Sequence, residues 1–202
     1  MPERISEIIE FWIGQAASDP EAAAGRNKLW YKPTKETDDT IRRRFGLDLA
    51  RAEAGELATW ATTPGGSLAL VILLDQFSRN LYRGTAKAYA NDTMALDIAL
   101  DAINSGKDQD LSLVGRAFLY HPLHHSEQIE VQDWNIRLFE SLLAEAGSEW
   151  KELISGFLHF AKEHRDVIRR FGRFPHRNVV LKRTSTNEEQ AYLEEGANRY
   201  GQ

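Results

Sequence analysis

LALVILL, residues 68–74, is the longest uninterrupted apolar run in a chain of 202 residues. Pro64, Gly65 and Gly66 precede the run and predict a turn, and polar residues begin directly after it at Asp75. A run without a polar face predicts a helix that is buried on most sides. It is far shorter than the roughly 20 residues that span a bilayer. The run therefore marks the centre of a helical core.

Apolar residues at helical spacing continue on the N-terminal side of this run. Residues 5–12 predict a helix that ends at Gly14, and residues 37–61 predict a second one that Gly46 and Gly55 interrupt. These segments predict two helices, the second with a possible break, on the N-terminal side of the central run.

The same spacing continues on the C-terminal side. We expect a helix with Asp92 as its N-cap, one that starts at Asp110, one that Ser126 opens, and one over residues 150–172. A short last helix is expected to begin with a capping box at one of two pairs, Ser185 with Glu188 or Thr186 with Glu189.

The fold class follows from these patterns. No stretch alternates apolar and polar residues between hairpin turns, so the prediction is an all-α chain without a sheet. The length suits one compact domain over residues 1–202. Helices joined by short turns favour stacked antiparallel hairpins, but no clean 34-residue repeat is present. The spacing alone predicts a helical array or bundle.

Composition excludes several classes of protein. The chain has no cysteine, which rules out disulfides, thiolate nucleophiles and cysteine-ligated metals. A net charge of -5 argues against a general nucleic-acid or anionic-membrane binder. The N-terminus is charged and unlike a signal peptide, so we expect a cytoplasmic protein without a membrane segment.

Positive charge is concentrated near the C-terminus. Residues 162–183 carry eight lysines and arginines against two acids, a local charge of +6 that leaves -11 for the rest of the chain. Arg169 and Arg170 suit the negative end of a helix dipole, and Gly172 suits a left-handed C-cap. Helix termination does not require the residues beyond it, which are Arg173, His176, Arg177 and Asn178. Such a loop suits a small anion or an acidic peptide, or it forms internal ion pairs with Asp75, Glu127 or another acid.

Motifs of known mechanism are absent. The sequence HRD at 164–166 is typical of the kinase catalytic loop, but Phe171 stands where that loop needs asparagine. No nucleotide-binding glycine loop, G-x-S-x-G or H-E-x-x-H occurs. A metal-ligating group can be drawn from four residues, His121, His124, His125 and Glu127. Pro122 disturbs their helical alignment, so we predict neither a metal nor another cofactor.

Polar residues follow the central run at helical spacing. The block contains Asp75, Arg79, Asn80 and Arg83. Spacings of four place Asp75, Arg79 and Arg83 on one face, so Asp75 and Arg79 are expected either to neutralise one another in the core or to form part of a site. Arg83 lies past the expected helix end, where it is more available to a ligand.

Two histidines complete the candidate site. His164 falls on the apolar stripe of its helix and is expected to be buried and neutral, as a core histidine or as a base. His125 lies two residues before Glu127, although Ser126 and Glu127 also suit a helix start.

The order of three blocks resembles one known family. LDQFSRNLYRG at 74–84, PLHHSE at 122–127, and RFGRFPHRN with LKRTSTNEEQAYL over 170–193 are similar to the bacterial family of domain of unknown function 924. The resemblance implies a tetratricopeptide-like, right-handed array of helical hairpins and brings no catalytic residues with it. Ser78 stands where that family often has proline.

Together these observations predict a binding protein. The three blocks are expected to form a polar pocket for a small anionic metabolite or a carboxylate-bearing peptide. An enzyme is the alternative, with His125 or His164 as base, Glu127 or Asp75 as its orienting carboxylate, and arginines 173 and 177 holding the substrate. A scaffold that binds partner helices is the third class.

Overall fold

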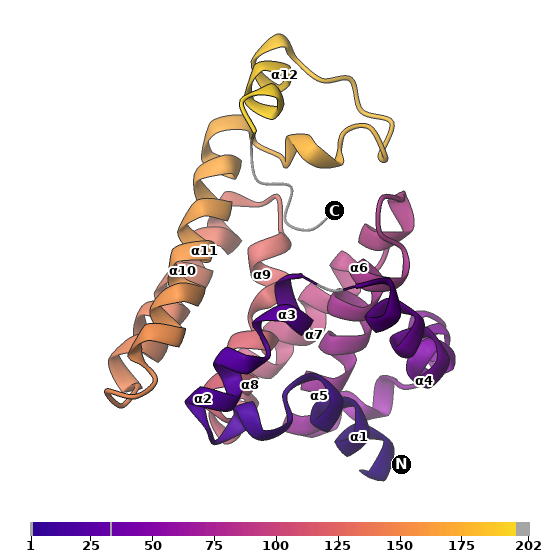
Figure 1. Cartoon of the computed structure of the whole chain (residues 1–202), viewed down its shortest axis with the longest axis vertical. Coiled ribbons are helices and arrows are strands. Elements are labelled where there is room, and N and C mark those ends of the chain that lie inside the picture. The colour runs from indigo at the N-terminus through magenta and orange to yellow at the C-terminus, as the bar shows by residue number, and fades with distance from the viewer. Residues whose placement is uncertain (1, 33, 197–202) are drawn as a thin grey trace.

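The computed structural model describes residues 2–32 and 34–196, and its regular structure is helical throughout that part (Figure 1). The α-helices are α1 (Pro2–Trp12), α2 (Pro20–Gly25), α3 (Asn27–Tyr31), α4 (Lys35–Glu53), α5 (Pro64–Val71), α6 (Ser78–Leu81), α7 (Asp92–Asn104), α8 (Leu113–Leu119), α9 (His121–His125), α10 (Ile129–Glu145), α11 (Lys151–Phe171) and α12 (Asn187–Glu194). Shorter turns are η1 (Gly14–Ala17), η2 (Ala58–Thr62), η3 (Ile72–Phe77), η4 (Ala86–Tyr89), η5 (Lys107–Asp110) and η6 (Pro175–Arg177). No strand occurs over the described ranges, which confirms the all-α prediction.

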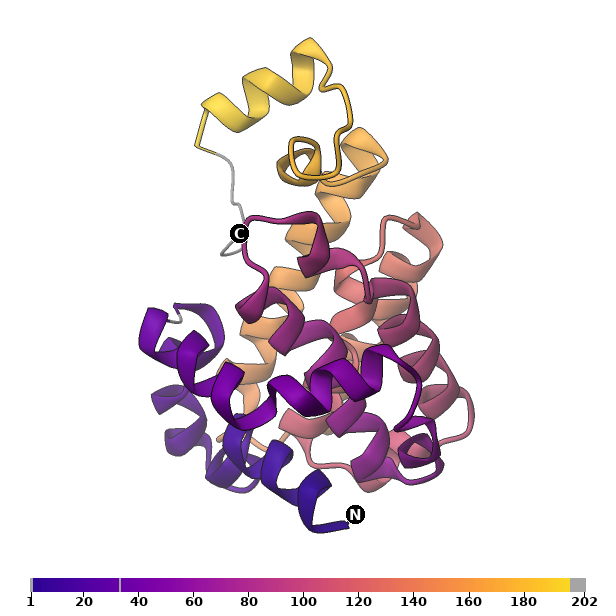
Figure 2. The same cartoon turned by 90° about the vertical axis from the view of Figure 1, so that its right-hand side faces the viewer.

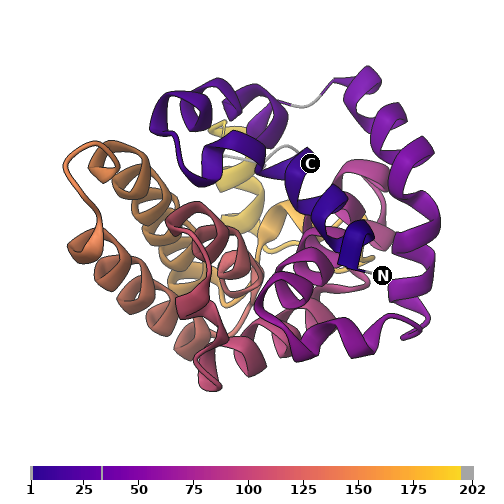
Figure 3. The ribbon, with the colours of Figure 1, turned by 90° about the horizontal axis from the view of Figure 1, so that it is seen from below.

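Helix α5 lies at the centre of the helical body. It packs against α1, α7 and α8, and every residue from Leu68 to Val71 is buried. Helices α10 and α11 run antiparallel side by side at one edge of the body, and α4 lies at the opposite edge (Figures 1 and 3). The apolar run at 68–74 therefore forms the core that the sequence predicts.

The start of α5 differs from the prediction. Pro64, Gly65 and Gly66 form the first turn of the helix itself, because Thr63 is its N-cap and accepts a hydrogen bond from the Gly66 N–H at 3.1 Å. Proline suits the first helical position because it needs no hydrogen-bond donor there. A Cβ atom on Gly66 would lie 1.9 Å from the Trp60 carbonyl oxygen, so glycine allows the close approach of η2.

The central helix changes its hydrogen-bond register directly after α5. Residues Ile72–Phe77 form a π-helical turn, η3, and the Ser78 N–H reaches back to the Leu73 carbonyl. A π turn inserts one extra residue into a helix, and such turns are frequent at functional sites. The Ser78 hydroxyl accepts a hydrogen bond from Asn91 Nδ2 at 3.0 Å, a contact that proline at this position cannot make.

Aromatic side chains surround the π turn and join it to the N-terminal helices. The ring of Phe77 packs on Phe45 of α4 with centroids 5.2 Å apart and on Trp12 of α1 at 5.5 Å. Phe118 of α8 packs against Trp12 at 5.9 Å and Trp30 at 4.9 Å. Phe77 thus joins η3 to α1 and α4, and Phe118 joins α8 to α1 and α3.

Several predicted helix boundaries need correction. Helix α4 runs through Gly46 without a break and ends before Gly55, whose φ of +76° suits glycine. Asn91 is the N-cap of α7, so Asp92 is its first helical residue. Ser112, and not Asp110, caps α8. Ser126 follows α9, and α10 begins at Ile129 with Gln128 as its N-cap.

The C-terminal segment packs on the end of α11 (Figure 2). Helix α11 ends at Gly172 with φ +69°, and Thr186 and Glu189 form the capping box of α12, as two of the predictions state. A small separate apolar cluster supports this segment, formed by Val167, Ile168 and Phe174 with Ile129, Phe171 and Tyr192. Within the described residues no helix is long and apolar enough to cross a membrane.

Two glycine substitutions test the role of close helix approach. Gly66→Ala is expected to lower the free energy of unfolding by about 2 kcal/mol or more, because the added methyl collides with backbone. Gly46→Ala is the matched control: it has open space and is expected to raise that free energy by about 0.5–1 kcal/mol. Urea denaturation measures both, and equal effects of the two substitutions would contradict the packing argument.

Candidate functional site

A buried carboxylate lies in the π turn. Asp75 is 0% exposed, and its Oδ1 atom lies 3.0 Å from an amino nitrogen of Arg79 and 2.7 Å from Nδ1 of His125. Gln76 donates a hydrogen bond of 2.5 Å to the other oxygen. A charge so deeply buried requires partners of this kind. The spacing of four residues predicted Arg79 as a partner of Asp75, and the second partner, His125, comes from α9.

A second carboxylate extends this contact into a chain of alternating charges. Arg79 also approaches Asp92 of α7 at 2.9 Å, and Arg177 of η6 donates to Asp92 at 3.2 Å. Asp75, Arg79, Asp92 and Arg177 thus connect η3, α6, α7 and η6. Burial raises the pKa of Asp92, whereas the two arginines act to lower it.

Aromatic rings hold the Arg177 guanidinium in place. Its central carbon lies 4.3 Å from the Phe174 ring centroid and 4.6 Å from the Tyr89 ring centroid. Residue Arg177 is only 5% exposed, and its Nε atom is buried without a hydrogen-bond partner among the described residues. A buried polar atom of this kind calls for an explanation, which a bound ligand or water can supply.

Histidine rings pack beside these charges. His121, His124 and His125 come from α9 and His164 from α11; ring centroids of His124 and His164 are 5.5 Å apart, and those of His125 and His164 are 6.0 Å apart. Burial lowers the pKa of His164 to about 3, and the Arg177 charge acts in the same direction. Burial also places the pKa values of His124 and His125 well below the ordinary value. At neutral pH the rings are uncharged.

Hydrogen bonds fix the tautomers of three of these rings, His121, His125 and His164. Nδ1 of His121 lies 2.7 Å from the Ala117 carbonyl, and Nδ1 of His164 lies 2.7 Å from the Phe160 carbonyl. A carbonyl oxygen only accepts, so each neutral ring carries its hydrogen on Nδ1 and a lone pair on Nε2. His125 has the same arrangement toward Asp75. We call the eight residues involved the arginine–histidine cluster: Asp75, Arg79, Asp92, His121, His124, His125, His164 and Arg177.

No metal centre arises from these histidines. Over residues 2–32 and 34–196, no group of three or more histidine, cysteine, aspartate or glutamate side chains has a metal-binding arrangement. Glu127 points to a different partner, since it accepts hydrogen bonds from Arg183 at 2.7 Å and from the Phe174 N–H at 2.8 Å. Glu127 thus holds the C-terminal segment and does not orient His125.

Arg173 and Asn178 belong to this same fastening. Arg173 donates two hydrogen bonds to Glu189, at 2.6 and 2.8 Å, and Asn178 donates to Glu189 at 3.3 Å. Of the two alternatives that the sequence leaves open for the loop, these two residues therefore follow the second, internal pairing with an acidic residue of the same chain. Arg177 differs, because it lies four residues along the loop and extends into the arginine–histidine cluster.

Asn80 of α6 and Arg83, just after it, contact a different helix. Asn80 donates to Asp38 of α4 at 2.8 Å, and Arg83 lies 3.5 Å from the same carboxylate. The sequence predicts that Arg83 is more available to a ligand. In the structure it forms an ion pair with Asp38. These contacts tie α6 to α4 and are separate from the contacts of Asp92.

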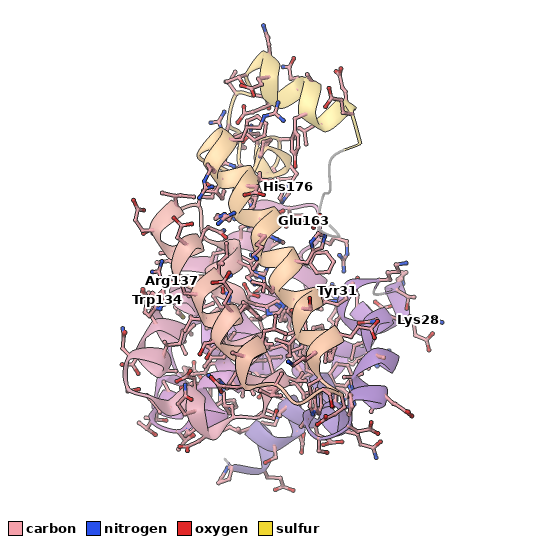
Figure 4. All side chains as sticks on the ribbon, turned by 90° about the vertical axis from the view of Figure 1, so that its left-hand side faces the viewer. Lys28, Tyr31, Trp134, Arg137, Glu163 and His176 are labelled. Atoms are coloured by element: carbon pink, nitrogen blue, oxygen red, sulfur yellow. The ribbon has the colours of Figure 1, made fainter. Side chains whose placement is uncertain are left out.

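His176 lies next to the cluster on the C-terminal side. Its ring centroid is 5.6 Å from that of Phe174, and burial together with Arg177 lowers its pKa to about 3. Figure 4 shows His176 near the end of α11, with Tyr31 beside the same helix and Trp134 on the other side of the α10–α11 pair.

Of the predicted site residues, the cluster contains Asp75, Arg79, His125, His164 and Arg177.

Four residues at the cluster were not predicted as site residues. Asp92 suits a helix cap so well that its sequence gives no reason to expect a partner far along the chain. Tyr89 carries no signal that separates it from other loop aromatics. His121 and His124 were considered only as metal ligands, although the spacings of three and four from His121 to His124 and His125 are those of one helical face.

The lowered histidine pKa values predict a pH-dependent stability. A histidine with a lowered folded-state pKa takes up its proton in the unfolded state first, so the free energy of unfolding falls as the pH falls below about 6.5. Each such histidine contributes a loss of about 1.4 kcal/mol between about pH 7.5 and pH 5.5. Urea denaturation at the two pH values is expected to show this loss, reduced by one histidine's share in His164→Gln. The exposed His159→Gln serves as control, and an identical pH profile in His164→Gln would contradict the burial argument.

Comparison with known proteins places these features in a family. Residues 8–197 match the family described as "Bacterial protein of unknown function (DUF924)". The solved structure of the protein of unknown function ATU0120 from Agrobacterium tumefaciens is 40% identical to this chain, with a TM-score of 0.80, over 95% of this chain and 97% of that one. The search of curated proteins found no match. With the match extending over almost its whole length, the chain belongs to the bacterial DUF924 family.

Proposed function

We propose that this is an intracellular binding protein for a small anion, either a free anionic metabolite or a carboxylate of a peptide. The ligand would contact Arg177 at the arginine–histidine cluster. The observation that carries the proposal is the buried Arg177 Nε atom, which lacks a hydrogen-bond partner among the described residues. A guanidinium with an unused N–H can donate it to an oxygen of an oxyanion, in a charge-assisted hydrogen bond.

Exposure at the edge of the cluster supports access for a ligand. The Asp92 side chain is 21% exposed and the His125 side chain is 13% exposed, whereas Asp75 is fully buried. The neutral imidazoles also support the proposal, since they add no positive charge that would repel Arg177. An anion that contacts Arg177 would therefore lie beside uncharged rings with hydrogen-bonding capacity.

The finer architecture is also part of this proposal. We propose that residues 1–202 form one domain in which helical hairpins stack in the right-handed, tetratricopeptide-like manner. The antiparallel pair of α10 and α11 supports this, as does the packing of α7 against α5. The π turn interrupts one hairpin, so the repeat is irregular at the cluster.

Anion binding is expected to raise the melting temperature. Phosphate, sulfate and a dicarboxylate are to be titrated, and a saturable increase marks binding to the native state. Excluded salts stabilise without saturation. The response is expected to vanish in Arg177→Gln, which stays folded because Arg79 still pairs with Asp92.

Arg173→Ala is the matched control. Its guanidinium already makes two hydrogen bonds to Glu189, so the substitution is expected to lower stability without anion and to leave the anion response intact. A flat response of the wild-type protein to every anion would exclude the proposed function. A response that survives in Arg177→Gln but disappears in Arg173→Ala would move the binding site to the loop.

An enzyme is the second candidate, favoured by one contact. Nδ1 of His125 lies 2.7 Å from the fully buried Asp75 carboxylate, which leaves Nε2 as the basic atom. A carboxylate that orients a histidine in this way is the usual arrangement for a general base. Arg177 would then hold an anionic substrate beside the base.

Model esters distinguish this candidate from simple binding. An enzyme of this type is expected to hydrolyse p-nitrophenyl phosphate or p-nitrophenyl acetate, and Asp75→Asn is expected to reduce the rate by a factor of about 100 or more through loss of the correct tautomer. His159→Gln is the control. No turnover of either ester by the wild-type protein leaves binding as the better account.

A further inference from the structure

We propose that the arginine–histidine cluster selects a tetrahedral oxyanion that keeps an O–H group at neutral pH, of which hydrogen phosphate is the simplest. This inference rests on the proposed function and names the class of ligand for that site. It depends on which atoms at the cluster donate hydrogen bonds and which accept them.

Acceptors are fixed on the histidine side. Nδ1 of His121 and Nδ1 of His125 each lie 2.7 Å from an oxygen that only accepts, so their hydrogens are on Nδ1. The Nε2 atoms of these neutral rings therefore carry lone pairs. Nε2 of His124 is buried and has no partner among residues 2–32 and 34–196. The histidine side of the cluster therefore offers acceptor atoms at His121 and His125.

Donors are fixed on the arginine side. Arg177 is 5% exposed and keeps an Nε–H without a partner in the described part of the chain. A guanidinium has no acceptor atom and stays protonated. Its contacts with Phe174 and Tyr89, at 4.3 and 4.6 Å, keep its plane in a fixed place. This side of the cluster therefore offers N–H groups to anionic oxygens.

The combination discriminates between anions of the same shape. Hydrogen phosphate accepts through its bare oxygens and donates through its O–H, so it satisfies both sides at once. Sulfate has four oxygens that only accept, and one of them would face an imidazole lone pair. An acceptor that faces another acceptor in a buried site loses a hydrogen bond and gains repulsion. Preference for the protonated anion follows.

Competing charges sharpen this preference. Asp75 and Asp92 are the carboxylates of the cluster, and they balance the charges of Arg79 and Arg177. Sulfate and hydrogen phosphate both add negative charge next to these carboxylates, but sulfate brings no donor with that charge. The O–H of hydrogen phosphate can instead approach an acceptor, which is the condition that sulfate cannot meet.

Calorimetric titration of the full chain at neutral pH tests the inference. Inorganic phosphate is expected to bind about tenfold more tightly than sulfate, the difference that one hydrogen bond to a charged group produces. Arsenate and selenate repeat the comparison with larger anions. Arsenate is expected to behave like phosphate and selenate like sulfate, since protonation and not size is the selecting property.

Variants locate the selecting acceptor. His125→Phe removes an Nε2 lone pair but keeps a ring, and it is expected to reduce phosphate affinity to that of sulfate while sulfate affinity is retained. His159→Phe, at an exposed position, is expected to keep the tenfold preference. If His125→Phe does not fold, the four-anion comparison on wild type still decides.

The outcomes separate the two proposals. Saturable binding of sulfate as tight as that of phosphate would overturn the ligand class and leave anion binding in place. Absence of saturable binding by all four anions would overturn both. A phosphate preference that persists unchanged in a folded His125→Phe variant would overturn the role of His125 Nε2 as the selecting acceptor.

Discussion

Burial of the Asp75 carboxylate in the central helix is the constraint on which the rest of the structure depends. The residue follows directly on the most apolar run of the chain and is 0% exposed. An isolated charge in such a place is very costly, so the fold must bring partners to it. Arg79 comes from the next turn, and His125 comes from a helix 50 residues later in the chain. The hydrogen bond between His125 and Asp75 thus joins α9 to the π turn.

The sequence predicts the core more completely than the cluster inside it. Apolar spacing predicts which residues are buried, and it located the central run and the α11 stripe with His164. Separate capping signals predicted Gly172 and gave Thr186 as one of two choices. It does not report hydrogen-bond register, so the π turn at Ile72–Phe77 is invisible in the pattern. The turn follows from tertiary packing around Phe77, which no local preference encodes.

Some residues have a local role at a helix end and also pair with a residue far along the chain, and the sequence indicates only the local role. Asp92 suits the first turn of α7, where a carboxylate favours the helix dipole, and the same carboxylate pairs with both buried arginines. Glu189 closes the capping box of α12 and receives Arg173 at the same time. Since each local role is sufficient to explain the residue, the distant partner cannot be inferred from sequence.

Arg177 links the two parts of the molecule. It follows the left-handed turn at Gly172 and enters the arginine–histidine cluster from the C-terminal segment, whose own apolar cluster is small. Glu127 holds that segment through Arg183, and Glu189 of α12 pairs with Arg173 inside the segment. Both pairs limit where Arg177 can reach. Because these fastenings and the cluster share one loop, any ligand that contacts Arg177 also adds to the attachment of the C-terminal segment.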